Sequence, residues 1–364
     1  MKITPHGGDI QTFVERFGCE PLDYSANTNP LGISPAAKAA ISKALDQADR
    51  YPDPYCRQLR NALSEKEGVD VDHIICGNGA ADLIFRLVMT VQPKKALLLA
   101  PTFSEYEESL VQGGSDISYF YLQEENDFAL TEEILPLITP DLDILFICEP
   151  NNPTGKCSSP TLLKTIAQRC ADTETMLVVD ECFNGFLTEP DTQSLKHLIQ
   201  HMPHLVILKA FTKLYGMAGV RLGYLFCSNN QVMDRMSKTG QHWAVSSLAQ
   251  AAGCAALAEN EWLRQGKEII AQERPRLIEG LRAAQCKIYE SDANYLLFQS
   301  TPFLGEYLAK QGILIRDCSN YKGLEKGYFR IAVRTHAENN RFLDALSQVV
   351  SETGTIKPTL NEEN

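Results

Sequence analysis

Short, nearly continuous apolar runs separated by longer amphipathic stretches constrain the fold of this chain more than any other feature. Such runs are typical of strands buried on both faces, and the stretches between them have helical spacing. The runs span residues 73–76, 96–100, 144–148, 176–180, 205–209 and 222–227. The alternation predicts an α/β fold with a mainly parallel sheet covered by helices on both sides. Ligands of such sheets bind beyond the carboxyl ends of the strands.

A change of pattern along the chain predicts two domains and two terminal segments. A chain of 364 residues is longer than one small core requires. The first ~30 residues show little periodicity. After the last apolar run, a long charged helix, which Pro275 is expected to kink or break, precedes shorter strands and two more helices. The expected parts are an N-terminal arm at 1–35 that packs on the small domain, a large domain at 36–258, a small α+β domain at 259–352 and a disordered tail at 353–364.

Composition and charge exclude several classes of function. The net charge of −12 argues against a nucleic-acid surface, which needs clustered Lys and Arg. The N-terminus lacks the apolar stretch of a signal peptide, and no apolar run approaches the ~18 residues of a membrane span. Eleven cysteines at wide spacing, without a C-x-x-C pair, argue against a zinc site and favour reduced thiols. We therefore expect a cytoplasmic protein with no metal ion, no nucleic-acid partner and no membrane contact.

Four polar fragments each follow an apolar run, where the predicted strands end. They are GNGAAD at 77–82, EPNNPTG at 149–155, DECF at 180–183 and AFTKLYGMAGVRLGY at 210–224. Singly, each has an ordinary explanation as a helix N-cap, a turn, a surface lysine or an incomplete dinucleotide loop. Four such fragments in this order at four strand ends favour one shared site.

The residue types in these fragments match the chemical needs of pyridoxal 5′-phosphate (PLP). Lys213 offers the amine that anchors the PLP aldehyde, and a desolvated lysine near other cations is a better nucleophile. Asp180 offers the carboxylate that keeps the pyridine nitrogen protonated, which makes the ring an electron sink. Asn151 can donate to the 3-oxygen, and Phe103, just after the run at 96–100, can stack on the ring.

The phosphate of PLP needs backbone N–H groups at a helix start together with a cation. Gly79, Ala80 and Ala81 open a predicted helix, whose N-terminus attracts an anion. The planar guanidinium of Arg221 can pair with the same phosphate. The sequence therefore predicts a PLP site at the carboxyl ends of the strands.

These fragments resemble the motifs of the fold type I PLP-dependent enzymes, the class I and II aminotransferase superfamily. NNPTG, the Asp-Glu pair after a strand, and T-K followed by G-x-R-x-G carry the resemblance, which covers nearly the whole chain. Within the superfamily, the sequence is similar to histidinol-phosphate aminotransferases and more closely to the threonine-phosphate decarboxylases of cobalamin biosynthesis. The segments that favour the second family are HGGDI (6–10), YSANTNPLG (24–32), PTFSEY (101–106), LIRDCSNY (314–321) and FRIAVR (329–334).

The resemblance implies a role for each residue of the cofactor site. Lys213 would be the Schiff-base lysine, Asp180 the partner of the pyridine nitrogen and Asn151 the partner of the 3-oxygen. Arg221 would bind the PLP phosphate. Tyr51 matches the tyrosine that reaches the PLP phosphate of the partner subunit, so the resemblance also implies a homodimer.

Three positions depart from the superfamily pattern. Ala210 stands where a Ser or Thr commonly binds the PLP phosphate, and Ala80 and Ala81 stand where a hydroxyl is often present. Thr212 and backbone donors are expected to compensate at the phosphate. Phe183 stands where many aminotransferases have a tyrosine that contacts the 3-oxygen, a departure that the decarboxylase family shares.

For the substrate, the resemblance implies a set of residues that grip a phosphate and a carboxylate. These residues are His6, Gly7, Asn27, Asn151, Arg316 and Arg334. Arg316 and Arg334 lie on neighbouring strand-like runs, so we expect them to converge on one pocket. The glycines after His6 permit a close backbone approach. Surface ion pairs and a frayed terminus are the ordinary alternatives for these arginines and for His6.

The expected reaction is decarboxylation of O-phospho-L-threonine to (R)-1-amino-2-propanol O-2-phosphate. The bond at Cα that lies perpendicular to the PLP ring is the one that breaks, and a firm grip on the phosphate would turn the carboxylate into that position. O-phospho-L-serine, which lacks one methyl group, is an alternative substrate, because a methyl group is worth only ~1–3 kcal/mol in a pocket. A histidinol-phosphate-type aminotransferase is a further alternative. A transcriptional regulator built on this fold is disfavoured by the acidic charge.

Overall fold

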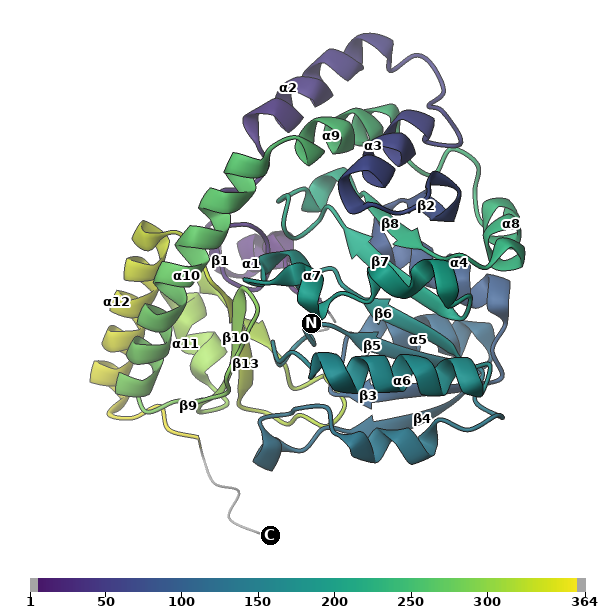
Figure 1. Ribbon diagram of the computed structural model, residues 1–364. Helices are drawn as coiled ribbons and strands as arrows, with labels where there is room; N and C mark the ends of the chain where they lie inside the picture. The colour runs from purple at the N-terminus through teal and green to yellow at the C-terminus, as the bar shows by residue number, and fades with distance from the viewer. Residues whose placement is uncertain (1–5, 359–364) are drawn as a thin grey trace.

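The computed structural model describes residues 6–358 and places seven strands in one central sheet (Figure 1). The strand order is β2-β8-β7-β6-β5-β3-β4. The strands are β2 (Ile74–Gly77), β3 (Lys95–Ala100), β4 (Asp116–Tyr121), β5 (Ile144–Cys148), β6 (Met176–Asp180), β7 (Leu205–Ala210) and β8 (Gly223–Phe226). All neighbouring pairs are parallel except the two that involve β8, which runs antiparallel to β2 and β7. The predicted α/β class with a mainly parallel sheet is confirmed.

Helices cover both faces of this sheet because successive strand residues point to opposite sides. Phe146, Val178 and Val206 share one core with α4 (Gly79–Val91), α5 (Ser104–Gly113) and α8 (Asn230–Lys238). Their chain neighbours on the same strands pack on the other face against α3 (Arg57–Glu67), α6 (Pro160–Asp172) and α9 (Ser247–Leu257). The helix α2 (Pro35–Ala44) runs along α9, and α7 (Pro190–Gln193) lies in the loop after β6 (Figure 1).

A second, smaller core forms around the C-terminal part of the chain. Its four-stranded antiparallel sheet has the order β12-β13-β10-β9. The elements are α10 (Asn260–Ala283), β9 (Lys287–Ile288), β10 (Tyr295–Gln299), α11 (Leu304–Lys310), β12 (Arg316–Asp317), β13 (Tyr328–Ala332) and α12 (His336–Thr353). Buried residues of these elements, such as Leu277, Phe298 and Phe342, make one contiguous cluster.

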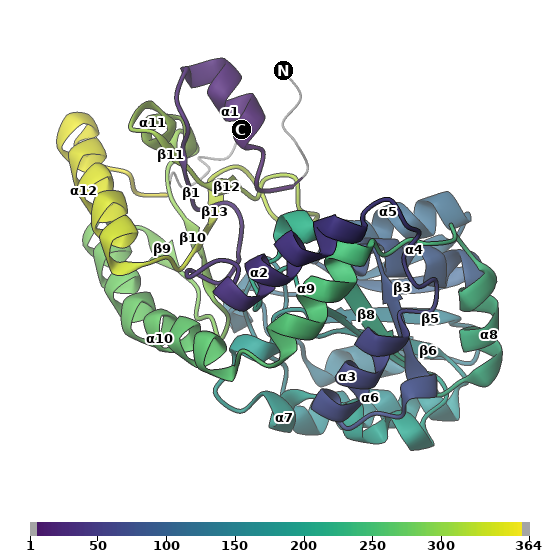
Figure 2. The ribbon, with the colours of Figure 1, turned by 90° about the horizontal axis from the view of Figure 1, so that it is seen from above.

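The N-terminal segment is ordered against this smaller core. It forms α1 (Ile10–Phe17) and β1 (Leu22–Asp23), and β1 pairs in parallel with β11 (Ile313–Leu314). Figure 2 shows α1 beside α11, and the Arg16 guanidinium lies 3.8 Å from the Glu306 carboxylate. The described part of this segment therefore has regular structure, although its sequence shows little periodicity.

Two expectations are corrected. The helix α10 does not break at Pro275, because a proline removes only one backbone hydrogen bond and the helix is held by buried residues on both sides of it, including Ile270 and Leu277. A kink at Pro275 stays a prediction. The tail was expected to be disordered from 353, yet Ile356 is fully buried and its carbonyl accepts hydrogen bonds from Thr301 N and Ser300 Oγ. Residues 359–364 lie outside the described residues, and the domain boundaries themselves stay a prediction.

Among the helices of the described part, none has the length and apolar character to cross a membrane.

Candidate active site

The four polar fragments meet at the carboxyl edge of the parallel strands. Asp180 ends β6 and is the Cα partner of Cys148, the last residue of β5. Asn151 follows β5, and Lys213 follows β7 in a loop. Gly79 begins α4 directly after β2. The topology thus brings residues that are far apart in the sequence to one edge of the sheet.

The surroundings of Lys213 favour an uncharged, nucleophilic amine. Its Nζ lies 5.3 Å from the centre of the Phe183 ring. Burial, together with the positive charge of Arg330, lowers the pKa of Lys213 to about 8, although Cys182 and Asp180 act in the opposite direction. A lysine with a lowered pKa presents far more free amine near neutral pH than an exposed one, which is what attack on an aldehyde needs.

Asp180 is buried and accepts hydrogen bonds on both oxygens. Its Oδ1 accepts from the Cys182 backbone N–H at 2.9 Å, and its Oδ2 accepts from the Tyr106 hydroxyl at 2.6 Å. Sequence reasoning did not identify Tyr106, because its spacing in α5 is that of an ordinary core residue. The PTFSEY segment that contains it contributed only to the family resemblance.

Asn151 is buried with its amide group fully engaged inside the protein. Its Nδ2 donates to the Pro101 carbonyl at 3.0 Å and to Thr154 Oγ1 at 3.1 Å, while its Oδ1 accepts from Thr102 at 3.0 Å. The Tyr295 hydroxyl donates to the Asn151 backbone carbonyl at 2.8 Å. Donation from Asn151 to a ligand therefore requires exchange of one of these hydrogen bonds.

A phosphate cradle forms where α4 begins. Gly79 has a φ of +84°, and a Cβ at this position would lie 2.7 Å from Nη2 of Arg221. The first turn of α4, with Ala80 and Ala81, has no side-chain cap from Asn78. Free backbone N–H groups beside a guanidinium form a binding site for an anion. Thr212, which was expected to assist here, is half-buried next to Lys213.

The segment that begins at His6 is held against the start of α5 and against Ser25. The His6 ring nitrogen Nε2 lies 3.2 Å from Glu105 Oε1, and the ring centroid lies 6.0 Å from that of Phe103. A Cβ on Gly7 would lie 2.2 Å from the Ser25 carbonyl oxygen. His6, Gly7, Ser25 and Arg316 line one cavity of ≈ 320 Å³. The close backbone approach that the glycines were expected to allow is present at Gly7.

Two buried arginines lie opposite each other on neighbouring strands. Arg316 on β12 and Arg330 on β13 are Cα partners, and both are buried. The Arg330 guanidinium donates to the Ser25 carbonyl at 2.9 Å and to the side-chain oxygen of Asn152. Within residues 6–358, its hydrogen-bond partners are neutral oxygens, so its charge is not neutralised by a carboxylate.

The expected convergence of Arg316 and Arg334 is wrong. Arg334 follows the end of β13, and its guanidinium forms an ion pair with Glu338 of α12 at 2.7 Å. Arg330 takes the place opposite Arg316, because the strand register pairs these two positions. The segment FRIAVR contains both arginines, and the sequence-based prediction chose the second of them.

Asn27 is a buried amide with its hydrogen bonds unmade. Asn27 is 1% exposed. Neither its side-chain oxygen nor its side-chain nitrogen has a hydrogen-bond partner among the described residues. A buried amide without partners costs about 1–3 kcal/mol. Such a group points to a ligand that completes its hydrogen bonds.

Tyr51 lies away from these residues on the surface of the protomer. It is 81% exposed, and its ring stacks on Trp243 with a centroid distance of 4.6 Å. The role of Tyr51 in a partner subunit stays a prediction.

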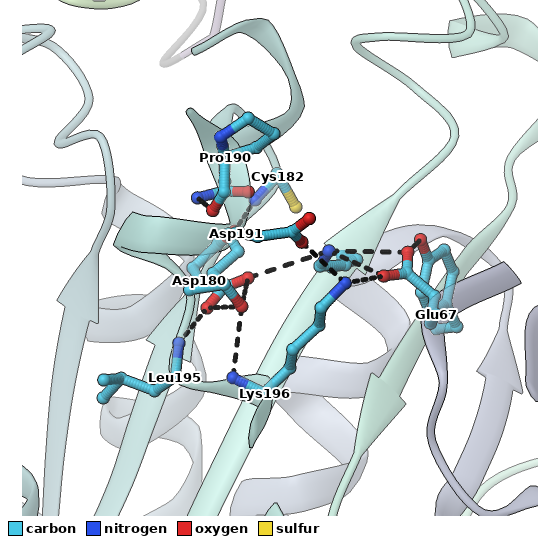
Figure 3. Close-up of polar contacts among 12 residues, drawn as sticks. Glu67, Asp180, Cys182, Pro190, Asp191, Leu195 and Lys196 are labelled. Carbon is cyan, nitrogen blue, oxygen red and sulfur yellow. Dashed lines mark hydrogen bonds and ion pairs between the residues drawn. The ribbon is translucent and has the colours of Figure 1, made fainter. Parts of the chain in front are cut away.

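A buried ionic cluster supports the loop after Asp180 (Figure 3). Lys209 Nζ lies 3.1 Å from Glu67 and 3.8 Å from Glu181. Lys196 bridges Glu67 and Asp191. Burial raises the pKa of Glu181, whereas Lys209 and the other donors around Glu67 outweigh burial and lower its pKa. The cluster ties α3 to the ends of β6 and β7, and so fixes the edge on which Asp180 lies.

Comparisons with known proteins agree with this geometry. The model of the family described as "Aminotransferase class I and II" matches residues 20–346. The threonine-phosphate decarboxylase of Salmonella typhimurium is 37% identical, with 95% of this chain and 96% of that protein covered. The adenosylcobalamin biosynthesis bifunctional protein CobDQ of Leptospira interrogans is 29% identical over 96% of this chain, which spans 41% of that longer protein. The crystal structure of the histidinol-phosphate aminotransferase from Clostridium acetobutylicum superposes with a TM-score of 0.84 at 28% identity, covering 90% of this chain and 99% of that one.

Proposed function

Because the chain belongs to the class I and II aminotransferase family, we propose that it is a PLP-dependent decarboxylase that converts O-phospho-L-threonine to (R)-1-amino-2-propanol O-2-phosphate. The observation that carries this proposal is the pair of buried arginines, Arg316 and Arg330, which are strand partners, together with the contribution of Arg330 to the lowered pKa of Lys213. Two buried cations at one place attract an anion with more than one charge, and a phosphate group supplies it.

The described residues fit PLP. Lys213 supplies the amine, Asp180 the carboxylate for the pyridine nitrogen, and Arg221 with the start of α4 the cradle for the phosphate. Phe103, which precedes α5, offers a ring for stacking. When bound, PLP supplies an electron sink for the bond that breaks at the substrate Cα.

Substrate binding follows from the polar groups that gather near this edge of the sheet. Arg316 and Arg330 would hold the phosphate, with His6 and Gly7 closing over it from the N-terminal segment. Asn27 would complete its unmade hydrogen bonds on the same substrate. A phosphate held by these arginines would fix the orientation of the substrate at Cα, and the orientation that we propose is one that favours loss of CO₂ over loss of the Cα proton. Lys213 Nζ is the group that would return a proton to Cα, since its lowered pKa suits proton transfer near neutral pH.

The biological context proposed is cobalamin biosynthesis, in a cytoplasmic homodimer. The name of the Leptospira interrogans relative, an adenosylcobalamin biosynthesis protein, supports the pathway. The stacked, exposed pair Tyr51 and Trp243 supports a subunit contact, in which Tyr51 reaches the cofactor phosphate of the partner. Eleven cysteines, none in a disulfide, favour a reducing compartment.

The test is an incubation of the protein with PLP and O-phospho-L-threonine in the absence of any 2-oxo acid. We expect CO₂ and the phosphorylated amine to accumulate over many turnovers. O-phospho-L-serine run in parallel identifies the preferred substrate. The similarity to a histidinol-phosphate aminotransferase makes transamination the second candidate. Absence of CO₂, with amino transfer from histidinol phosphate once 2-oxoglutarate is added, would establish that second activity instead.

A further inference from the structure

The carboxylate of Asp180 is held by one side chain that the reaction itself does not require. The Tyr106 hydroxyl donates to Asp180 Oδ2 at 2.6 Å, and both residues are buried. The other oxygen, Oδ1, accepts from the Cys182 backbone at 2.9 Å. With one donor on each oxygen, the plane of the carboxylate is fixed at the edge of the sheet.

The Tyr106 side chain is itself rigidly placed. Its ring stacks on Phe146 with a centroid distance of 5.0 Å and meets Phe103 edge-on at 5.6 Å. Burial, followed by the negative charge of Asp180, raises the pKa of Tyr106 well above its usual value. The phenol therefore stays protonated at any physiological pH and acts as a donor to Asp180.

The same helical turn contacts other parts of the site. Phe103 immediately precedes α5 and Tyr106 lies three residues further, so one helix start places the ring-stacking residue and the donor to Asp180. Glu105, between them, contacts His6 at 3.2 Å. The position of α5 thus sets the geometry of Asp180 together with that of the N-terminal segment.

We propose that Tyr106 is a positioning residue, whose hydroxyl orients the Asp180 carboxylate for the protonated pyridine nitrogen of the cofactor. This inference rests on the proposed function, because it assumes that Asp180 meets the pyridine nitrogen. A carboxylate that has lost the Tyr106 donor can rotate and must be re-ordered when the cofactor binds. The affinity of the protein for the cofactor then falls, even where no covalent bond to Lys213 forms.

The experiment measures binding of pyridoxamine 5′-phosphate to the full-length protein freed of its cofactor. This probe has an amine in place of the aldehyde, so it reports the non-covalent contacts alone. Tyr106→Phe is expected to weaken its binding roughly tenfold, within the usual range for loss of a hydrogen bond to a charged group. The second probe is the analogue in which a C–H replaces the pyridine nitrogen, for which we expect Tyr106→Phe and the unchanged protein to bind equally.

Tyr289→Phe is the matched control. The Tyr289 side chain is also buried and donates to a carboxylate, Glu124, at the same 2.6 Å, but it contacts none of the proposed cofactor residues. The Tyr289→Phe variant should lose stability in a thermal melt, as Tyr106→Phe does, but its affinity for pyridoxamine phosphate should not change. The inference is overturned if Tyr106→Phe and the unchanged protein bind pyridoxamine phosphate equally well. It is also overturned if Tyr106→Phe weakens the binding of pyridoxamine phosphate and of the C–H analogue by the same factor. Failure of the unchanged protein to bind pyridoxamine phosphate would instead overturn the cofactor site.

Discussion

Arg316 and Arg330 are direct partners across the antiparallel strands β12 and β13, with both side chains buried. Like charges opposite each other on one face of a sheet are destabilising. Arg316 donates to Asn320 Oδ1 at 2.7 Å, and Arg330 donates to neutral oxygens of Ser25 and Asn152, so an anionic substrate would add a charged partner to the pair.

Replacement of either arginine should therefore separate activity from stability. We expect Arg330→Gln and Arg316→Gln each to lower kcat/KM for O-phospho-L-threonine by about 100-fold or more, since a buried charge pair with a ligand is worth at least ~3 kcal/mol. In a thermal melt, the unliganded variants should lose only the stability that the hydrogen bonds of the replaced side chain supply, about 1–3 kcal/mol. Arg334→Gln is the control, because its partner is Glu338 and a partly exposed ion pair contributes little. A loss of activity in Arg334→Gln equal to that in Arg330→Gln would contradict the assignment.

Asn27 and Asn29 form a second matched pair. Both are buried, but Asn29 donates to the Leu214 carbonyl at 2.9 Å and accepts from Leu31 at 3.0 Å, whereas the Asn27 amide has no partner in the described chain. Asn29→Ala should lower the free energy of unfolding by about 1–3 kcal/mol. Asn27→Ala should leave it unchanged or raise it, and should raise KM for the substrate about tenfold. Urea denaturation and steady-state kinetics check both statements, and a destabilised Asn27→Ala with normal KM would refute the ligand role.

The sequence was sufficient for the fold and for the location of the strand-end motifs, because those signals are local. Asp180 ends one apolar run and Lys213 lies shortly after another, so their meeting at one edge follows from parallel topology. Arg330 was missed in favour of Arg334, because the choice depends on the register between β12 and β13, which no local pattern encodes. Tyr106 was missed for a related reason, since a helix-core tyrosine and a donor to a distant carboxylate have the same spacing.

The lowered pKa of Lys213 predicts how the stability of the cofactor-free protein depends on pH. The pKa is about 8 in the folded protein against an ordinary value of 10.5. Below pH 8 the lysine is charged in both states, and the folded state bears the full cost of burying the charge. Between pH 8 and 10.5 the unfolded chain holds more protons, so the Lys213 contribution to stability rises with pH.

A variant without this amine isolates the contribution. Lys213→Met should be more stable than the parent protein at pH 7, by up to about 3 kcal/mol. The difference should narrow as the pH rises from 8 towards 10.5. Urea denaturation of both cofactor-free proteins at pH 7, 8 and 9.5 measures it. A difference that stays constant over this range would mean that the pKa of Lys213 is not lowered.

Gly79 should tolerate no side chain, for two separable reasons. Its φ of +84° is strained for any L-residue, and a Cβ would lie 2.7 Å from the Arg221 guanidinium. Gly114 follows α5 with a φ of +74°, and a Cβ there would meet no atom of a described non-neighbouring residue within 4 Å, so Gly114→Ala carries the backbone strain alone. Gly114→Ala should lose about 1 kcal/mol of stability, and Gly79→Ala should lose at least as much. Only Gly79→Ala should also release PLP on dialysis, because the new methyl group displaces Arg221. The visible absorbance of the bound cofactor measures this release. Retention of PLP by Gly79→Ala would argue against a phosphate site at α4.

Tyr51 provides the test of whether each active site is built from two subunits. Its ring is 81% exposed and stacks on Trp243, so in one protomer it contacts none of the catalytic groups. If it serves the partner, Tyr51→Ala and Lys213→Ala homodimers are each inactive but complementary. Subunit exchange in an equal mixture then yields heterodimers in which one site carries both defects and the other carries neither. We expect the mixture to recover about a quarter of the parent activity, because half of the dimers have one intact site of two. Mixtures that stay inactive after exchange, verified by mass spectrometry, would place Tyr51 in its own subunit's site or outside any site.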